Sequence, residues 1–157
     1  MSNELTHIDE SGGVRMVDVS DKAVTERKAV AVSSVTFPSD VFAILKEGDF
    51  QTKKGSLIQT AIIAGISGVK RTSELIPLCH NIIIEKADVS IVAEENVLNI
   101  SCEVKTTGKT GVEMEALTGA SLAALCIYDM CKALSQQMTI GPTYLQEKTG
   151  GKSDYRK

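Results

Sequence analysis

The stretch KADVSIVAEENVLNISCEVK (residues 86–105) carries the clearest structural pattern in the chain. Apolar and polar side chains alternate in two runs, separated by the acidic and polar residues 94–96. A period of two is typical of half-buried strands, and the short polar break indicates a hairpin turn. The apolar positions are Ala87, Val89, Ile91, Ala93, Leu98, Ile100, Cys102 and Val104. The stretch therefore predicts two antiparallel strands with one face to be covered.

Before this hairpin, the pattern predicts one strand and two helices. Small and β-branched side chains fill residues 29–37, and Pro38 ends that strand. We expect Ser39 to cap a short helix through Leu45 that Gly48 closes. In the longer helix that follows, Ile58, Ile62, Ile66 and Val69 recur at helical spacing, so this stripe should face the sheet. Gly65 and Gly68 within it indicate close backbone packing, since each costs a helix about 1 kcal/mol relative to Ala.

After the hairpin we expect a third helix over roughly residues 111–136 and a last strand near 139–147. Gly141 and Pro142 fall inside that strand, which should be an edge strand or contain a bulge. The order β-α(α)-β-β-α-β is the split, ferredoxin-like arrangement of the α+β class, an antiparallel sheet with helices on one face. We expect one such domain over residues 25–148, a flexible arm over 1–24 and a flexible Gly- and Lys-rich tail over 149–157.

Composition excludes several functional classes. The 157 residues are 43% hydrophobic and carry a net charge of −3, which disfavours nucleic-acid binders and polybasic membrane-surface proteins. The longest uncharged stretch, residues 116–128, is shorter than the ~18–20 residues that cross a bilayer. The four cysteines have no Cys-x-x-Cys spacing, and residues 1–20 contain no apolar segment of a signal peptide. We expect a soluble cytoplasmic protein with reduced thiols and no metal site.

Asp129 is the most informative single residue. It is the only charged residue between Ala116 and Cys131, in a helix so apolar that it should be buried. A buried carboxylate must be paired, protonated or in use. Lys132 follows three residues later, within reach on the same helix. The two residues are either a structural ion pair at the rim of the core or a general acid/base pair with shifted pKa values.

His80 ends the turn formed by residues 75–80, which Pro77 makes rigid. Functional groups concentrate on loops of this kind, although a single histidine is as readily a surface or core residue. Cys79 is a poor candidate for a nucleophile beside His80, because adjacent strand residues point to opposite faces. Nor do one His and four unpatterned Cys make a zinc site.

The sequence TGKTG (residues 107–111) joins a strand to a helix like a phosphate-binding loop, but Glu103 stands where that loop requires Gly. The start of the helix could still hold a phosphate. Thr110 and Glu113 have the spacing of a capping box. Glu115 has no such structural explanation, so it is the better functional candidate.

Glu115 and Asp129 are 14 residues apart on one helix, about 21 Å. They cannot meet at one small ligand within one chain, so a site that uses both needs two subunits. Basic residues cluster at the ends of elements, where they suit a polyanion such as a triphosphate or are simply solvated. They are Lys53, Lys54, Lys70, Arg71, Lys148 and Lys152.

Three longer motifs resemble the cyclic pyranopterin monophosphate synthase family, molybdenum cofactor biosynthesis protein C. They are LIPLCH (75–80), TGKTGVEMEALT (107–118) and IYDMCKA (127–133). Shorter agreements fall at residues 16–20, at Lys54-Gly55 and at residues 140–142. The resemblance covers almost the whole chain.

The resemblance implies a lyase that rearranges cyclised dihydro-GTP into cyclic pyranopterin monophosphate and releases pyrophosphate. Its substrate would come from an upstream radical GTP cyclase. The rearrangement moves protons but no electrons, so no cofactor is expected. The family further implies a cytoplasmic homohexamer, a trimer of dimers, with sites at the subunit interfaces.

The family's functional positions fall on named residues of this chain. Asp129 and Lys132 match its catalytic acid and base. Its substrate contacts match Leu78, Cys79, His80, Met114 and Glu115, and further functional positions match Lys54, Lys70 and Glu113. One departure concerns the tail, where Asp154 follows Ser153 in place of the Gly that the family pattern leads us to expect. This departure leaves the conformation of the tail around Lys152 open.

Other functions remain possible from the residues alone. A ferredoxin-like ligand-binding or regulatory module would use Asp129 only as a structural residue. An RNA-binding sheet is disfavoured because residues 97–106 contain no aromatic side chain. A phosphate-loop hydrolase is disfavoured by the missing Gly at position 103. The sequence does not decide the order of proton transfers or the separate roles of Lys54 and Lys70. Nor does it decide whether a metal assists the release of pyrophosphate.

Overall fold

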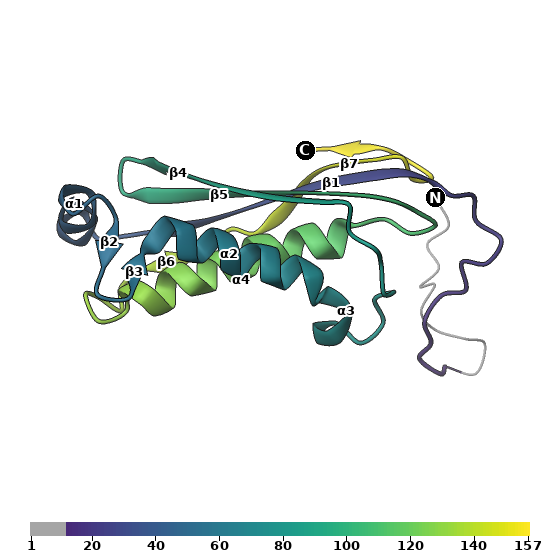
Figure 1. Cartoon of the computed structure of the whole chain (residues 1–157), viewed down its shortest axis with the longest axis horizontal. Helices are drawn as coiled ribbons and strands as arrows, with labels where there is room; N and C mark the ends of the chain where they lie inside the picture. The colour runs from purple at the N-terminus through teal and green to yellow at the C-terminus, as the bar shows by residue number, and fades with distance from the viewer. Residues whose placement is uncertain (1–11) are drawn as a thin grey trace.

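The computed structural model describes residues 12–157, which form one antiparallel sheet with helices on one face (Figure 1). The strands of this sheet are β1 (Thr25–Thr36), β4 (Lys86–Glu94), β5 (Val97–Gly108), β6 (Thr139–Ile140), β7 (Tyr144–Thr149) and β8 (Tyr155–Arg156). The helices are α1 (Ser39–Glu47), α2 (Leu57–Lys70), α3 (Thr72–Leu75) and α4 (Glu113–Cys131). A separate small hairpin pairs β2 (Gln51–Thr52) with β3 (Gly55–Ser56).

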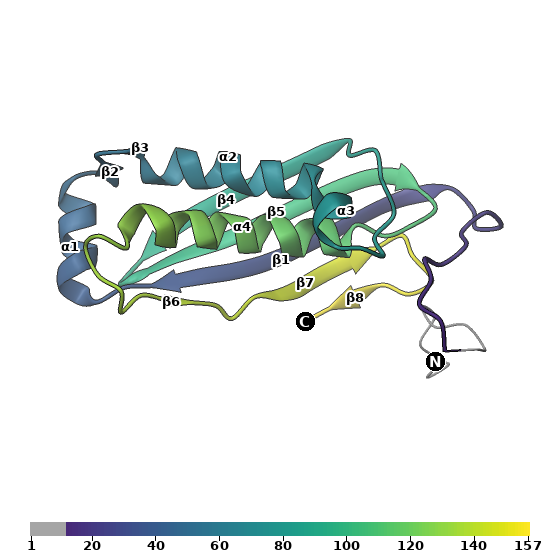
Figure 2. The same cartoon turned by 90° about the horizontal axis from the view of Figure 1, so that it is seen from below.

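The strand order is β4-β5-β1-β7-β8, with the short β6 paired to β1. The helices α2 and α4 lie side by side on one face of the sheet and run in opposite directions (Figure 2). The four long strands and two long helices follow the split β-α-β order, so the α+β, ferredoxin-like prediction is confirmed. Figure 2 also places α1, β2 and β3 at one end of the molecule, and α3 near the other.

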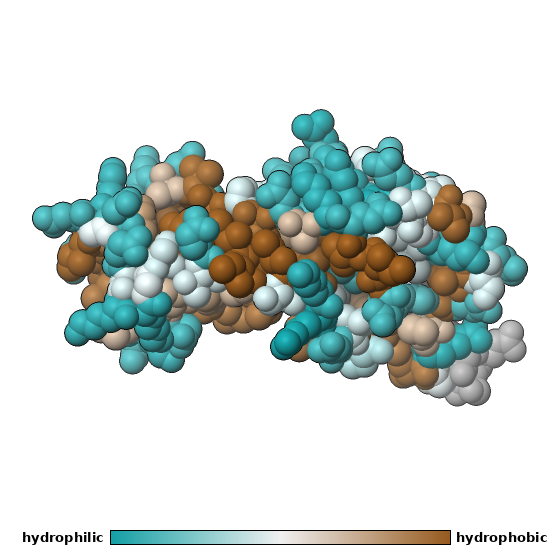
Figure 3. All heavy atoms as spheres, in the orientation of Figure 1, coloured by the Kyte–Doolittle hydropathy of each residue, from teal (hydrophilic) through white to brown (hydrophobic). Residues whose placement is uncertain are grey.

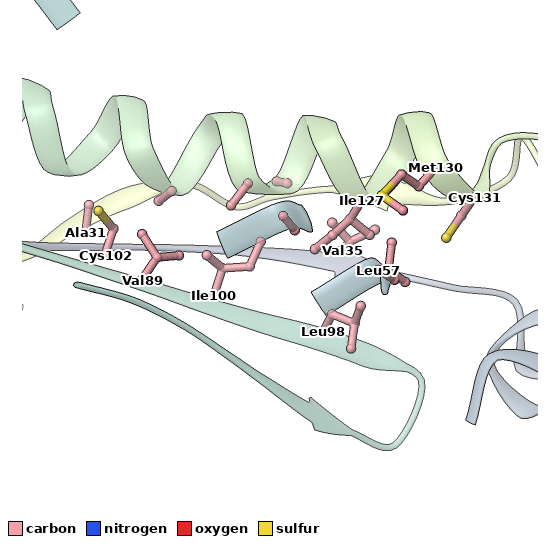
Figure 4. Close-up of a cluster of buried hydrophobic side chains, with 14 of the residues drawn as sticks. Ala31, Val35, Leu57, Val89, Leu98, Ile100, Cys102, Ile127, Met130 and Cys131 are labelled. Carbon is pink, nitrogen blue, oxygen red and sulfur yellow. The ribbon is translucent and has the colours of Figure 1, made fainter. Parts of the chain in front are cut away.

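The hairpin predicted at residues 86–105 is present in the expected register. Ala87 lies opposite Val104, and Ala93 lies opposite Leu98. The turn is tight, with Glu95 in the left-handed region at φ 50°. The side chains of Leu98, Ile100, Cys102 and Val104 are buried, and Figure 4 shows the first three pointing into the core between the sheet and the helices.

The core lies between the sheet and the two long helices. From α4, the side chains of Ala116, Ala120, Ala123, Ala124 and Ile127 are buried between the sheet and α2. The small residues let the helix approach the sheet closely, which an α-helix with larger side chains could not do. Gly65 and Gly119 allow the same close approach between α2 and α4, because a Cβ on Gly65 would lie 3.0 Å from the Gly119 carbonyl oxygen. The close packing predicted for α2 is therefore confirmed.

The buried stripe predicted for α2 is wrong at three of its four positions, where the buried residue is the one before the predicted isoleucine. The buried residues are Leu57, Ala61, Gly65, Gly68 and Val69, whereas Ile58, Ile62 and Ile66 are half-buried. The reason is that α2 packs chiefly on α4, and Gly65 and Gly68 on that side let the two helices approach closely. The isoleucines are only partly covered, and Ile66 lines a hollow with Ile82, Ile84 and Ala87. Figure 3 shows apolar surface gathered in the middle of the face that it draws.

Ser39 is not the cap of α1. Pro38 occupies the cap position, with φ −56° and ψ 143°, and Ser39 is already the first helical residue, so no side chain caps this helix. The Ser39 hydroxyl instead accepts a hydrogen bond from Asn96 Nδ2 at 2.8 Å, which joins α1 to the β4–β5 turn. Gly48 closes the helix as predicted, with its N–H bonded to the Ile44 carbonyl.

The C-terminal elements differ in extent from the prediction. The helix α4 ends at Cys131, and the last strand is divided at Gly141 and Pro142 into β6 and β7. The pairing of β7 with β1 shifts register between Val30 and Ala31, so a bulge is present, but its extra residue is Gln146 and not Gly141 or Pro142, to which the prediction tied it. No sequence pattern pointed to β8, which lies within the predicted tail and pairs with β7.

Among residues 12–157, α4 is the one helix long and apolar enough to cross a membrane by length and composition. More than half of its most apolar part is buried within the protein, against α2 and the sheet. A buried core helix can be equally long and apolar, so the packing of α4 against α2 and the sheet accounts for its composition.

Candidate functional site

The predicted site residues fall into two groups near opposite ends of α4 (Figure 2). Asp129 and Lys132 lie at its C-terminal end, towards β2 and β3, and Glu115 lies in its first turn, towards α3. The helix is unbroken between them, so 14 residues separate the two carboxylates by about 21 Å. No single small ligand spans both groups within one chain.

At the C-terminal end, Asp129 is held between two lysines. Its Oδ1 lies 2.7 Å from Lys132 Nζ and its Oδ2 lies 3.0 Å from Lys54 Nζ. Lys54 comes from the β2–β3 turn, where Thr52 Oγ1 accepts from the Lys54 N–H and donates to the Gly55 carbonyl. The turn thus delivers a lysine to a helix that is distant in sequence. We call Lys54, Asp129 and Lys132 the carboxylate–lysine cluster.

The predicted burial of Asp129 is wrong, because its side chain is 55% exposed. Ile127, Met130 and Cys131 take the inward positions in this last turn of α4 and leave Asp129 facing outward. The pKa of Asp129 is nonetheless lowered, first by its bond to Lys132 and then by Lys54. In turn, Asp129 raises the pKa of Lys132. The cluster therefore rests as a carboxylate with two ammonium groups, a proton acceptor beside proton donors.

At the other end of α4, Glu115 is a buried carboxylate, only 4% exposed. Burial is the main cause that raises its pKa, and the negative charge of Glu113 adds to it. Cys79 lies nearby, since burial and then the Glu115 charge raise the pKa of its thiol. A raised pKa keeps the thiol protonated, which argues against a nucleophilic Cys79.

His80 is bonded to the N-terminal segment. Its Nε2 lies 2.8 Å from the Val17 carbonyl oxygen. Because a carbonyl oxygen only accepts, Nε2 carries the proton in this contact. Lys109 makes a similar contact, donating from Nζ to the Ser20 carbonyl at 2.6 Å. These two bonds fix residues 17–20 of the predicted arm beside the Glu115 end of the molecule; residues 1–11 lie outside the described part.

The remaining predicted contacts line the same end. Leu78 and Cys79 are half-buried after α3, and Met114 is 39% exposed in the first turn of α4. Lys70 is exposed at the end of α2, where it lines a shallow surface hollow with Ile66, Ile82, Ile84, Glu85 and Ala87. No described contact joins Lys70 to Glu115 or to Asp129.

A pocket rich in basic side chains opens at the start of α4, with a volume of about 200 Å³. Its cations are Lys22, Arg27, Lys28, Lys109, Lys148 and Lys152, and the one carboxylate in its wall is Glu113. We call it the basic pocket. Lys148 Nζ pairs with Glu113 Oε1 at 3.1 Å, and Lys28 pairs with Glu103 and Glu147. The surplus of positive charge suits a polyanion.

Sequence patterns pointed to Lys109, Lys148 and Lys152 but not to Lys22, Arg27 or Lys28. These three are close together in the sequence but far from Lys109, Lys148 and Lys152, and β1 brings Arg27 and Lys28 to those lysines by pairing with β5 on one side and with β7 on the other. In that register Lys28 lies opposite both Lys105 and Thr149. No linear spacing would have identified them.

The capping box predicted at Thr110 and Glu113 is not formed. Val112 is the cap residue of α4, and no side chain caps the helix start. Glu113 instead folds back over Gly111, where a Cβ would collide with its carboxylate, and pairs with Lys148. Glu113 therefore faces the basic pocket, as a functional residue would.

Within residues 12–157, no three His, Cys, Asp or Glu side chains gather closely enough to hold a metal ion. The four cysteines are unpaired.

Comparison with known proteins gives a consistent result. A family model described as the MoaC family matches residues 16–151. A relative from Xanthomonas axonopodis pv. citri, named cyclic pyranopterin monophosphate synthase, is 56% identical over 98% of this chain and 93% of its own length. Relatives with the same name from Brevibacillus brevis and Bacillus velezensis are each 50% identical, over 98% and 96% of this chain and 95% and 90% of their own lengths.

Proposed function

Because the chain belongs to the MoaC family, we propose that it is a cyclic pyranopterin monophosphate synthase of molybdenum cofactor biosynthesis. It acts as a lyase on cyclised dihydro-GTP, supplied by an upstream radical GTP cyclase. The products are cyclic pyranopterin monophosphate and pyrophosphate. The observation that carries the chemistry is the carboxylate–lysine cluster, an ionised Asp129 between two ammonium groups.

In this proposal the cluster moves protons. Ring opening, pyran closure and formation of the cyclic phosphate each require protons to be moved at oxygen or nitrogen, and none requires electrons. Lys132 donates and Asp129 accepts, and because the two groups are in contact their apparent pKa values belong to the pair. Lys54 holds the second oxygen of Asp129 and keeps it ionised. The chain needs no cofactor for these steps.

The basic pocket binds the triphosphate. Six cations from four segments of the chain surround it, and multiple Lys and Arg contacts are what phosphate oxygens require. The same charges stabilise pyrophosphate as it leaves, because negative charge accumulates on the leaving group. The Glu115 end binds the rest of the substrate, through Leu78, Cys79, His80, Met114, Glu115, Glu113 and Lys70.

One complete site then needs two chains. The carboxylate–lysine cluster and the Glu115 end are about 21 Å apart on α4, too far for one nucleotide to reach both. We propose that each site joins the cluster of one subunit to the Glu115 end of another, in a hexamer built as a trimer of dimers. The four unpaired thiols agree with a cytoplasmic location.

The decisive experiment is single-turnover conversion of cyclised dihydro-GTP, with product and pyrophosphate followed together. Asp129→Asn should make no product, while wild type makes both. Asp88→Asn is the matched control, since Asp88 is also exposed and paired to a lysine, Lys86 at 3.4 Å, but lies outside both groups. Asp88→Asn should react like wild type.

A ligand-binding module without activity predicts a different result. Asp129 would then be structural, and Asp129→Asn would lower the melting temperature without affecting any reaction. Exposed ion pairs contribute little to stability, so we expect the melting temperature to change little. If wild type stayed folded and oligomeric but made no product, the binding module would become the better explanation.

A further inference from the structure

We infer that Asp154 is a positioning residue, which fixes the turn after β7 so that Lys152 faces the basic pocket. The identity of the ligand, a di- or triphosphate, rests on the proposed function. The placement of the turn rests on contacts that involve neither the carboxylate–lysine cluster nor Glu115.

The turn closes a hairpin between β7 and β8. Lys148 lies opposite Tyr155, and Glu147 lies opposite Arg156. Inside the turn, Asp154 Oδ1 accepts a hydrogen bond from the Gly150 N–H at 3.0 Å, so the side chain reaches across residues 150–154. The Asp154 side chain thus joins the end of the turn to its beginning.

Gly150 is the fixed point of the turn. Its carbonyl accepts from Thr25 Oγ1 at 2.8 Å, while its N–H is held by Asp154. Its φ of +82° favours glycine, and a Cβ there would collide with the Glu26 carbonyl oxygen. Both polar groups of Gly150 are therefore engaged, one by β1 and one by the turn itself.

The next two residues line the basic pocket. Gly151 lies against Arg27, where a Cβ would be 3.1 Å from the guanidinium, and Lys152 follows in the pocket wall. Lys152 makes no described ion pair, unlike Lys28 and Lys148. A turn held before the ligand arrives avoids the entropy cost of ordering it on binding.

The end of the hairpin is held independently. The Lys157 N–H donates to the Gln146 carbonyl at 2.9 Å, and its ammonium lies 3.7 Å from the centre of the Tyr144 ring. β8 therefore has contacts of its own beyond Asp154. Loss of the Asp154 side chain should loosen the turn without releasing the strand.

Two substitutions of Asp154 can distinguish an effect of its hydrogen bond from an effect of its negative charge. A carboxylate near a pocket for anions opposes binding through its charge, so any benefit must come from the hydrogen bond. Asp154→Asn keeps an acceptor oxygen and removes the charge, and Asp154→Ala removes both. Positioning predicts that the Asn variant binds at least as well as wild type and the Ala variant binds worse.

The test is the dissociation constant of pyrophosphate, measured by calorimetry on the full chain. Asp154→Ala should weaken binding by about 3- to 10-fold, the range expected for one hydrogen bond. In a Lys152→Ala background the same change should cause no further loss, because the group being positioned is gone. Glu47→Ala, which removes an exposed acid from α1, is the control and should bind like wild type. For the synthase reaction, Asp154→Ala should lower kcat/KM, because Lys152 belongs to the pocket that holds the triphosphate.

Three results would overturn the inference. They are equal weakening by Asp154→Asn and Asp154→Ala, full additivity of Asp154→Ala with Lys152→Ala, and a wild-type chain that does not bind pyrophosphate. Binding is measured without turnover, so its failure can be distinguished from failure of the synthase reaction. A wild-type chain that binds pyrophosphate in the expected pattern but makes no product would retain this inference and reject the synthase.

Discussion

Glu115 is a carboxylate whose environment opposes its charged form, unlike Glu103 and Asp129, whose pKa values are lowered. Its carboxylate is 4% exposed, and burial raises its pKa. The native state therefore binds a proton more readily than the unfolded state, so the stability contributed by this group falls as pH rises through its raised pKa. A buried carboxylate at neutral pH costs stability, which is the usual price of a functional residue.

We expect Glu115→Gln to be more stable than wild type at neutral pH, with a melting temperature higher by about 3 °C. The gain should vanish below about pH 4.5, the ordinary pKa of this carboxyl, where both states are protonated. Thermal unfolding across pH measures it. Glu74→Gln, at an exposed position of α3, is the control and should show no such dependence. A Glu115→Gln protein less stable than wild type at neutral pH would contradict this assignment.

Two residues show what sequence patterns can and cannot decide about a site. The pairing of Asp129 with Lys132 could be predicted, because residues three apart on a helix are neighbours. The exposure of Asp129 could not, because the apolar composition of α4 does not say which side of its last turn meets the core. The Lys54 contact depends on where the β2–β3 hairpin packs, and no local pattern encodes it.

At the scale of elements, the crossing of α2 over α4 depends on glycine. A Cβ on Gly119 would lie 2.6 Å from Cys102 Sγ and from Val69 Cγ2, distances that side chains do not adopt. Gly119→Ala should therefore destabilise the protein by about 1–3 kcal/mol, despite the better helix propensity of Ala. Chemical denaturation measures the difference.

Gly48→Ala is the matched control for this prediction. Gly48 has a φ of −82°, and a Cβ there would lie 3.5 Å from the Ile44 carbonyl oxygen, an ordinary contact. We expect its stability to be close to that of wild type. If Gly119→Ala were as stable as wild type, the packing around Gly119 would be looser than the structure shows.

Elements with a local repeat could be predicted, and elements defined by tertiary contacts could not. The β4–β5 hairpin follows from its alternation, and every long element was found in its correct order. The buried stripe of α2 was misplaced because α4 offers it a surface of small residues, which the sequence of α2 alone does not reveal. The strand β8 is short and exposed, so it has no apolar pattern to detect.

For the whole molecule, the separation of the two groups predicts complementation between inactive variants. Asp129→Asn and Glu115→Gln, each inactive alone, should regain activity when their subunits are mixed and exchanged. With equal and random mixing, about a quarter of sites would join two intact halves from different chains. Single-turnover product formation measures the recovery.

The control is the same pair of proteins assayed together without subunit exchange, which should stay inactive. A double variant that carries both changes should not be rescued by either single variant, because every chain in such a mixture lacks the same half of the site. Absence of any recovery after exchange, with mixed oligomers present, would place each complete site within one chain.

The position of β1 at the centre of the sheet also has a consequence for synthesis. Thr25 of β1 pairs with Gly108, and Lys28 pairs with Thr149, so both neighbours of this early strand are far later in the sequence. During synthesis β1 has no partner strand until β5, and later β7, has been translated. Closing such long loops slows folding and leaves strand edges open to other chains. We expect newly made protein to depend on chaperones until residues 144–149 have joined β1.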